Sequence, residues 1–165
     1  MKFPLCEQCI EAEELCPACE QLLREGKITA LDVAVSHLLG RLKRKLSLEN
    51  ADFVKALDLG KLVVIVATGK IGVFIGRKGR IVTEVSRELG RKVRVIEQTS
   101  DEKKMVQDLV GKAQVLGINK VFSPAGQEYK VVVAKKDAPR LVSGKARLEE
   151  AIRQLLGAKA TIAFE

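Results

Sequence analysis

The chain has 165 residues, of which 47% are hydrophobic, and its 29 Lys and Arg exceed its 21 Asp and Glu by a net charge of +8. This length and apolar content predict one ordinary domain or two small ones, and the positive charge favours a polyanionic partner. No apolar run approaches the roughly 20 residues that cross a bilayer, and the first residues lack the apolar region of a signal peptide, so we expect a cytoplasmic protein without a membrane partner.

The charge is unevenly distributed along the chain. Residues 1–29 hold three Lys and Arg against six Asp and Glu. Residues 30–101 hold 14 against 8, and residues 102–165 hold 12 against 7. An acidic head therefore precedes two basic segments, and we expect any nucleic-acid surface to lie in those segments.

The head contains all four cysteines, arranged as two C-x-x-C pairs: Cys6, Cys9, Cys16 and Cys19. Each tight turn directs two thiolates at one tetrahedral ion, which predicts one structural Zn²⁺ per chain within residues 1–28. Disulfides are the alternative, but the reducing compartment of an intracellular nucleic-acid binder disfavours them. A redox C-x-x-C lies beside a strand–helix unit, which this segment lacks. Because so short a head has almost no core, metal is expected to order it.

Acidic side chains surround the predicted metal ligands: Glu7, Glu11, Glu13, Glu14 and Glu20. Together with four thiolates around one divalent ion, they give a potential that repels phosphate. We therefore expect the head to contact a basic protein surface or the chain's own basic helix at 30–46.

That helix is predicted to begin after a Thr29 cap. Its apolar stripe contains Leu31, Val35, Leu38, Leu42 and Leu46. Its opposite face carries Arg41, Lys43, Arg44 and Lys45. We interpret these cations as a solvated helix face, with an RNA contact as the alternative.

The next elements form one compact pattern. Residues 52–67 predict a hairpin that turns at Asp58–Gly60, and its second strand is the β-branched run LVVIVA. A short helix, the loop GRKG at 76–79 and a second helix follow. Ile81, Val85 and Leu89 recur every fourth residue on one face of that second helix, and Gly90 is placed to end it. The segment KVRVIE then alternates as a half-buried strand does.

The same pattern occurs twice. A shift of 67 residues places 61–97 over 128–164 without a gap, with the apolar phases aligned. Identical pairs include Val64/Val131, Val66/Val133, Lys78/Lys145, Arg80/Arg147 and Gly90/Gly157. In the second copy, residues 101–110 predict the first helix after a Ser100 cap, and 118–134 predict the hairpin. We therefore expect two copies of one small α+β unit.

These residues resemble a known family. A GXXG loop between two helices, on this order of elements, is similar to the type II KH domain, and the tandem copy resembles the KH pair of archaeal NusA-like transcription factors. The resemblance implies an α+β fold of two tandem type II KH domains, each in the order α-β-β-α-α-β, behind a zinc-binding head. The predicted boundaries are 1–28 for the head, 29–100 for the first KH domain and 101–165 for the second.

The resemblance also predicts where RNA binds. A KH loop clamps about four nucleotides, because glycines let the backbone approach phosphate and the next helix directs its N-terminal N–H groups at it. The expected RNA-binding residues of this loop are Ile75, Gly76, Arg77, Lys78, Gly79, Arg80 and Ile81. Arg91, Lys92 and Arg94 flank the last strand of the same copy and are further candidates.

The second copy departs from the motif. Its aligned loop reads Ser143-Gly144-Lys145-Ala146, so both motif glycines are replaced, although Lys145 and Arg147 retain positive charge. We expect this copy to fold around Val131, Val133, Val142, Leu148, Ile152 and Ile162. It should serve as a packing platform with weak RNA contacts of its own.

The sequence thus predicts a single-stranded RNA-binding, NusA-like factor that acts on nascent transcripts in elongation or termination, with RNA polymerase or the ribosome as a partner. The alternatives are a KH protein that binds ribosomal or other structured RNA in assembly or processing, and a protein–protein adaptor whose KH units are scaffolds. No catalytic residues or small-molecule substrate are expected. The single histidine, His37, is interpreted as a satisfied helix residue, and the GRKG loop lacks P-loop spacing.

Overall fold

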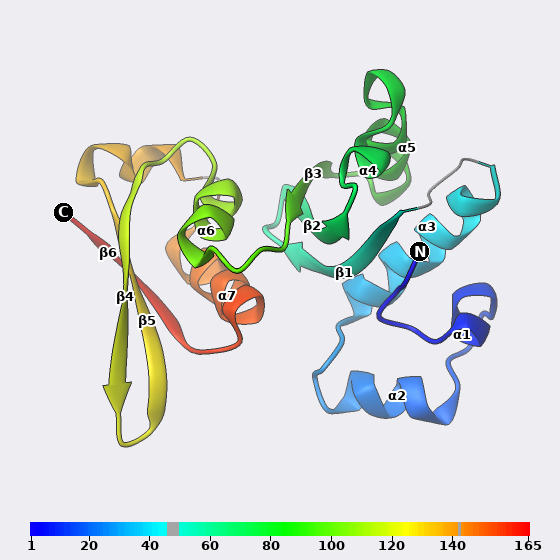
Figure 1. Cartoon of the computed structure of the whole chain (residues 1–165), viewed down its shortest axis with the longest axis horizontal. Helices are drawn as coiled ribbons and strands as arrows, with labels where there is room; N and C mark the ends of the chain where they lie inside the picture. Colours follow the sequence, from blue (N-terminus) through cyan, green and yellow to red (C-terminus); the bar gives the residue numbers. More distant parts are fainter. Residues whose placement is uncertain (46–49, 142) are drawn as a thin grey trace. The chain divides into compact units, whose positions relative to one another are not determined.

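The computed structural model describes residues 1–45, 50–141 and 143–165. Two predicted core residues, Leu46 and Val142, lie outside these ranges, as do the side chains of Arg44 and Lys45. The chain divides into two compact units (Figure 1). The first contains Met1–Ala56 and Val63–Glu97, and the second contains Leu57–Leu62 and Gln98–Glu165. No helix in the described part of the chain has the length and apolar character to cross a bilayer.

The first unit begins with two short helices, α1 (Glu7–Glu11) and α2 (Pro17–Arg24), which precede the long helix α3 (Ala30–Lys45). The predicted cap of α3 is confirmed. The Asp32 N–H donates to Thr29 Oγ1 over 3.1 Å, and the Thr29 N–H donates to Asp32 Oδ2 over 2.9 Å. These reciprocal bonds form a capping box, which satisfies N–H groups that the helix itself cannot pair.

The sheet of the first unit has the strand order β1-β2-β3. Strands β1 (Ala51–Asp58) and β2 (Leu62–Gly69) are joined by the predicted turn, in which the Gly60 N–H donates to Asp58 Oδ1 over 2.9 Å. Helix α4 (Gly72–Ile75), a 3₁₀ turn at Arg77–Gly79 and helix α5 (Arg80–Leu89) then lead to β3 (Lys92–Glu97). Gly90 ends α5 in the left-handed conformation, with φ 67° and ψ 22°, as predicted.

The core of this unit lies where α3, α4 and α5 cover the sheet. Its fully buried side chains include Val35 and Leu39 from α3, Val63 from β2, and Phe74 from α4. The predicted stripe of α3 is buried at Val35, Leu38 and Leu42, whereas Leu31 is partly buried at its edge. The spacing of apolar residues in the sequence therefore correctly predicted most of the α3 face that packs on the core.

The second unit repeats this order of elements (Figure 1). Helix α6 (Glu102–Val110) precedes the antiparallel pair β4 (Val115–Ser123) and β5 (Gly126–Val133). A 3₁₀ helix (Lys135–Arg140) and α7 (Lys145–Leu156) then lead to β6 (Ala160–Phe164), which pairs in parallel with β5. The fold-class prediction of a cysteine-containing head before two α+β units with three-stranded sheets is confirmed.

Two details of the second unit refine the sequence prediction. The predicted core residues within the described range, namely Val131, Val133, Leu148, Ile152 and Ile162, are buried. The cap of α6 is Asp101 and not Ser100, because the Asp101 Oδ1 accepts from the Lys104 N–H over 3.1 Å. Both residue types favour this position, so composition alone placed the cap one residue early.

Candidate nucleic-acid interface and metal centre

The GRKG loop connects α4 to α5 in the first unit and has an unusual backbone. Gly76 has φ 73° and ψ 178°, Lys78 has φ 56° and ψ 30°, and Gly79 has φ 73° and ψ 18°. Such positive φ values cost little for glycine but are uncommon for other residues. The loop therefore holds its backbone in a shape that most sequences would avoid.

The two glycines of the loop have different surroundings. A Cβ at Gly76 would lie 2.9 Å from Ile81 Cγ1 and 3.1 Å from the Ile81 backbone N, so this position has no room for a side chain. A Cβ at Gly79 would meet nothing within 4 Å. Gly76 is thus required by packing, whereas Gly79 leaves the backbone at the start of α5 open to an incoming group.

Positive charge gathers at this open backbone. Arg77, Lys78 and Arg80 are all exposed. Gly79 is the N-cap of α5 and provides no side-chain acceptor for the first N–H groups of that helix. Uncapped N–H groups and the helix dipole both favour an anion at this place.

The predicted apolar neighbours of the loop divide into one exposed and one buried residue. Ile75 is 44% exposed, whereas Ile81 is 6% exposed and belongs to the core. Ile81 therefore packs beneath Gly76 and does not present its side chain to solvent. Among the further candidates, Lys92 is exposed, and Arg91 and Arg94 are half-buried and engaged with other groups of the protein.

The corresponding loop of the second unit has a different backbone. Gly144 is the N-cap of α7 with φ −60° and ψ 152°, and no described residue from 143 to 146 has a positive φ. Lys145 and Arg147 are exposed. The loop retains cations at a helix start but lacks the left-handed backbone of GRKG, because Ser143 and Ala146 stand where the first unit has glycine.

The four cysteines of the head form one cluster. Their sulfur atoms all lie within 4.8 Å of one another, and the Sγ atom of Cys6 lies 3.4 Å from that of Cys9 and 3.9 Å from that of Cys16. Cys9 and Cys19 are buried, Cys16 is half-buried and Cys6 is exposed. The structure thus brings all four predicted ligands together in an arrangement that can hold one metal ion.

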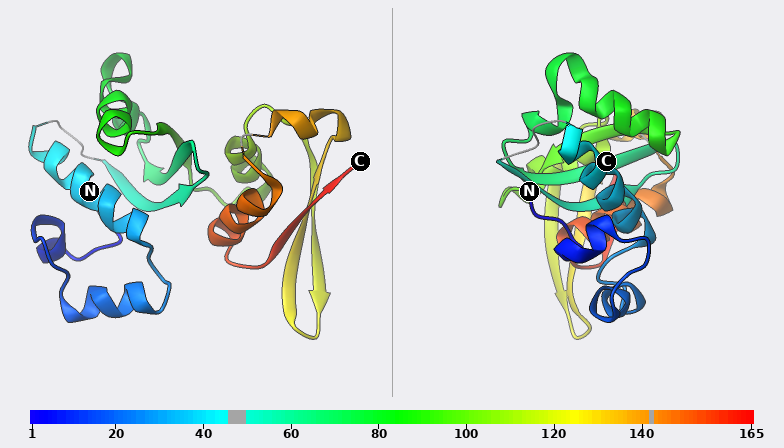
Figure 2. Two further views of the ribbon diagram at one scale, coloured as in Figure 1. Left: turned by 180° about the vertical axis from the view of Figure 1, so that it is seen from behind. Right: turned by 90° about the vertical axis from the view of Figure 1, so that its right-hand side faces the viewer.

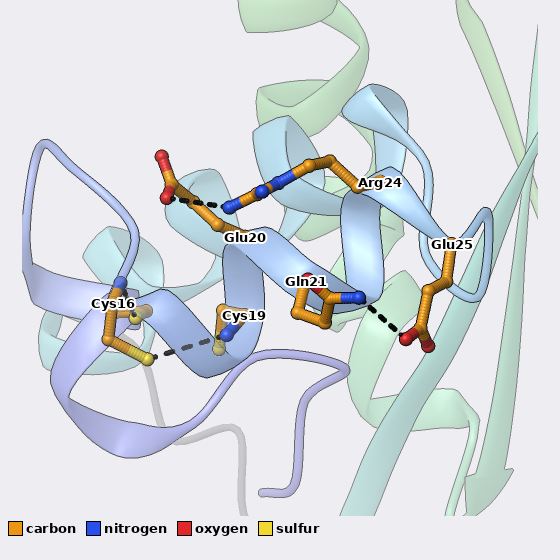
Figure 3. A network of polar contacts seen from close by, with 7 residues as sticks. Cys16, Cys19, Glu20, Gln21, Arg24 and Glu25 are labelled. Carbon is orange, nitrogen blue, oxygen red and sulfur yellow. Dashed lines mark hydrogen bonds and ion pairs between the residues drawn. The ribbon is translucent and has the colours of Figure 1, made fainter.

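Backbone N–H groups point at the thiols of this cluster. The Cys16 N–H donates to Cys9 Sγ over 3.1 Å, and the Cys19 N–H donates to Cys16 Sγ over 3.5 Å at the start of α2 (Figure 3). The Cys19 N–H and the neighbouring Cys9 thiol lower the pKa of Cys16 to about 7. At Cys9 the Cys16 N–H acts in the same direction, but burial and the other thiols outweigh it and raise the pKa to about 12.

Helix α2 is also held by its own surface contacts (Figure 3). Glu20 and Arg24 approach to 3.5 Å, and the Gln21 amide donates to Glu25 over 2.8 Å. The members of each pair are four residues apart, so they lie one turn apart on the same face of the helix. Being exposed, both pairs contribute little stability, and α2 is also held by Cys19 in the cysteine cluster and by packing of Leu22 and Leu23.

The head packs against α3, which was one of the two contacts predicted for it. His37 Nε2 of α3 lies 2.8 Å from the Cys9 carbonyl oxygen. Because a carbonyl only accepts, Nε2 carries the proton of this bond. His37 is therefore a satisfied helix residue, as predicted, and its bond also ties α3 to Cys9 of α1, a member of the cysteine cluster.

A glycine inside α3 makes this approach possible. A Cβ at Gly40 would lie only 2.4 Å from Ile10 Cγ2 of α1. Glycine in a helix interior costs up to about 1 kcal/mol relative to alanine, and here the cost is offset by close packing of α1 on α3. The sequence analysis did not identify this contact, although an isolated glycine in an apolar helix pattern was a signal for it.

The prediction that the head has almost no core is wrong. Leu5, Cys9, Cys19 and Ile28 form a buried cluster, with Val33 of α3 packed against it. The start of the chain also reaches the first sheet, since the Phe53 N–H of β1 donates to the Lys2 carbonyl over 2.9 Å. Met1 and Phe3 pack on the core of the first unit.

Comparisons with known proteins support the fold of the chain and the resemblance of its first unit to a KH domain. No curated protein matches the chain. The crystal structure of APE1850 resembles this chain with a TM-score of 0.54 and 19% sequence identity, covering 72% of this chain and 91% of that one, which shows a common fold. Residues 35–98 match the model of the NusA-like first KH domain, and the GRKG loop lies inside this match.

Proposed function

We propose that this chain is an RNA-binding, NusA-like protein whose first unit clamps single-stranded RNA at the GRKG loop. The observation that carries the proposal is the left-handed backbone at Gly76, Lys78 and Gly79, set at the uncapped start of α5 within a region similar to a KH domain. A loop of this kind grips the backbone of about four nucleotides.

The geometry suggests a role for each part of the loop. The open space above Gly79 lets a phosphate reach the backbone N–H groups of α5, where the helix dipole favours negative charge. Arg77, Lys78 and Arg80 supply full charges around that phosphate. The exposed Ile75 offers an apolar edge to a base, and Ile81 supports the loop from beneath.

The second unit is proposed to be a second KH domain that supports binding through Lys145 and Arg147. It attracts RNA by charge but lacks a backbone that a phosphate can approach closely. The similarity of the first unit to NusA-like proteins favours nascent transcripts as the target and RNA polymerase as a partner, in elongation or termination. We propose a binding role without catalysis, in the cytoplasm.

The cysteine cluster is proposed to hold one structural Zn²⁺ per chain. Tetrahedral coordination with Zn–S bonds of about 2.3 Å places sulfur atoms about 3.8 Å apart. The distances of 3.4 Å and 3.9 Å from Cys6 Sγ to its neighbours lie on either side of that value. The ion would join α1, whose Cys9 is also held by His37, to α2, and four protein ligands leave no open position for chemistry.

Charge reversal in the loop tests the proposed RNA site. Arg77→Asp with Lys78→Asp should abolish most RNA binding and leave the melting temperature nearly unchanged, because both side chains are exposed and both glycines remain. For wild-type protein, a clamp on about four phosphates implies a slope of log affinity against log salt near −3 for single strands.

The second unit provides a matched control. Lys145→Asp with Arg147→Asp changes the net charge equally but should weaken binding much less, because that loop lacks the left-handed backbone. Equal losses in the two double variants would show that binding depends on net charge alone. Crosslinking and sequencing of the bound RNA then separates nascent transcripts from ribosomal RNA.

A further inference from the structure

The hairpin of β4 and β5 extends past the rest of its sheet (Figure 2). The two strands pair from Val115↔Val133 to Ser123↔Gly126. Strand β6 pairs with β5 only from Tyr129 to Val133. Within the described chain, residues 121–128 are therefore a two-stranded ribbon without a third strand beside it, and all of residues 119–126 are exposed.

The end of this ribbon carries an exposed aromatic ring. The chain has five Phe, one Tyr and no Trp, and all six aromatic residues lie in its described part. Phe53, Phe74 and Tyr129 are buried, and Phe3 and Phe164 are half-buried, whereas Phe122 is 77% exposed. A phenyl ring held in water at the end of a ribbon costs free energy that a bound partner could recover.

The neighbours of Phe122 on its own face are polar. Directly opposed residues of an antiparallel pair share a face, and residues two apart on one strand do also. Gln127 is opposite Phe122, and Lys120 is two residues away on the same strand. Val121 lies on the other face, opposite Glu128.

Lys120 is held in place by Tyr129 and Glu102. Its ammonium lies 5.9 Å from the centre of the Tyr129 ring and 3.4 Å from Glu102, while its side chain remains 49% exposed. This face thus presents an aromatic ring and an amide on directly opposed residues, with a cation two residues further along β4. These groups match the base face, base edge and phosphate of a nucleotide.

We propose that Phe122 is a stacking platform for an unpaired base of single-stranded RNA, with Lys120 and Gln127 contacting the same strand. A pocket in a partner protein would have to desolvate Lys120 and Gln127 together with the ring, because these two polar residues are the described neighbours of Phe122 along and across the ribbon on this face. RNA covers the ring with a base and leaves the cation beside a phosphate. This inference rests on the proposed RNA-binding function and assigns a second contact, in the second unit.

A tryptophan substitution gives a direct test, since the chain has no Trp of its own. In the full-length Phe122→Trp variant, polyadenylate should quench the indole fluorescence by stacking, while filter binding shows affinity equal to or above wild type. The matched control is Val121→Trp on the opposite face, where Val121 is 46% exposed. Its fluorescence should change little at saturating RNA.

Removal of the ring completes the test. Phe122→Ala should weaken polyadenylate binding roughly tenfold without changing the salt slope, because phenylalanine carries no charge. Val121→Ala should leave binding unchanged, and both variants should have the melting temperature of the wild type. If wild type binds RNA but Phe122→Trp is not quenched and Phe122→Ala binds normally, the stacking platform is excluded while the loop site stands.

Two other outcomes also contradict the inference. Absence of RNA binding by wild type would overturn both the proposed function and this contact. Normal RNA binding by Phe122→Ala, combined with loss of a copurifying protein, would assign the ribbon to a protein interface.

Discussion

Two residues of α3 decide how the head packs on the rest of the first unit. Their residue types alone do not indicate this role. Gly40 leaves room for Ile10, and His37 donates to the Cys9 carbonyl. Both lie on α3, and their partners are about 30 residues earlier in the chain. Neither residue belongs to the cysteine cluster, yet both position α1, which contains Cys9.

Gly40→Ala should destabilise the protein although alanine is the better helix former. The new methyl would lie 2.4 Å from Ile10 Cγ2, so α1 must move away from α3. We expect a lower free energy of unfolding and weaker retention of metal, measured by urea denaturation and by competition with a chelator.

A second substitution tests the cause of that loss. Ile10→Ala removes the opposing methyl groups, so Gly40→Ala should be much less harmful in an Ile10→Ala background. Additive losses in the double variant would show that the clash with Ile10 is not the reason.

At the scale of elements, Asp32 connects α3 to the sheet. It is 4% exposed, and its Oδ1 accepts from the Ala56 N–H of β1 over 2.6 Å while its Oδ2 accepts from the Thr29 N–H. One carboxylate thus completes the capping box and satisfies a strand N–H 24 residues away. The sequence predicted the cap at Thr29, but it gave no indication that Asp32 also reaches β1.

Asp32→Asn should lower the free energy of unfolding by about 1–3 kcal/mol, because the amide can accept only one of the two bonds and loses the charge that strengthens both. Denaturant titration of the first unit's transition measures this loss. The control is Asp52→Asn, since Asp52 accepts a single bond from the Lys2 N–H at the surface and its loss should be smaller. Equal effects of the two substitutions would contradict the bridging role.

The loop before α5 and the corresponding loop before α7 also show that residue type alone does not fix a contact. Both are followed by a helix and both carry cations, so composition predicts anion attraction in each. Only the first has glycine where φ is positive, and the second, with both motif glycines replaced, has no positive φ among its described residues. The burial of Ile81 under Gly76 was not predicted, because the helical period marks Ile81 as apolar but does not say whether the core or a ligand covers it.

At the scale of the whole molecule, metal binding should stabilise the first unit and leave the folding of the second unchanged. The head shares packing with α3 and β1, so it is not an independent appendage. Purified protein should hold one zinc per chain. Cys16→Ser should release it, loosen residues 1–25 and lower the melting temperature of the first unit, because Met1, Phe3 and Ile10 lose their fixed positions.

Metal analysis and hydrogen exchange measure these effects. Faster exchange should be confined to the head, α3 and β1, with α6 and α7 protected as in wild type. Cys16→Ser protein that retains one zinc per chain, or a wild type made under reducing conditions without zinc, would contradict the assignment. As a control, Glu13→Gln removes a charge from the head without removing a ligand and should leave the metal content unchanged.

The sequence by itself determined the features that depend on residues near one another in the chain. The strands follow from runs such as LVVIVA, the helices from stripes such as Ile81, Val85 and Leu89, the turns and helix ends from Gly60 and Gly90, and the cysteine cluster from two C-x-x-C pairs. The gapless repeat also predicted two units of similar fold, because two segments with the same apolar pattern are expected to pack in the same way.

Only the tertiary structure decided the contacts between distant segments. These are the bond from Asp32 to Ala56, the fit of Ile10 against Gly40, the bond from His37 to Cys9 and the projection of Phe122 past β6. The physical reason is that burial and hydrogen bonding depend on which segments meet in space. Periodicity shows that a residue is apolar or able to cap a helix, but its partner is fixed only when the whole chain packs.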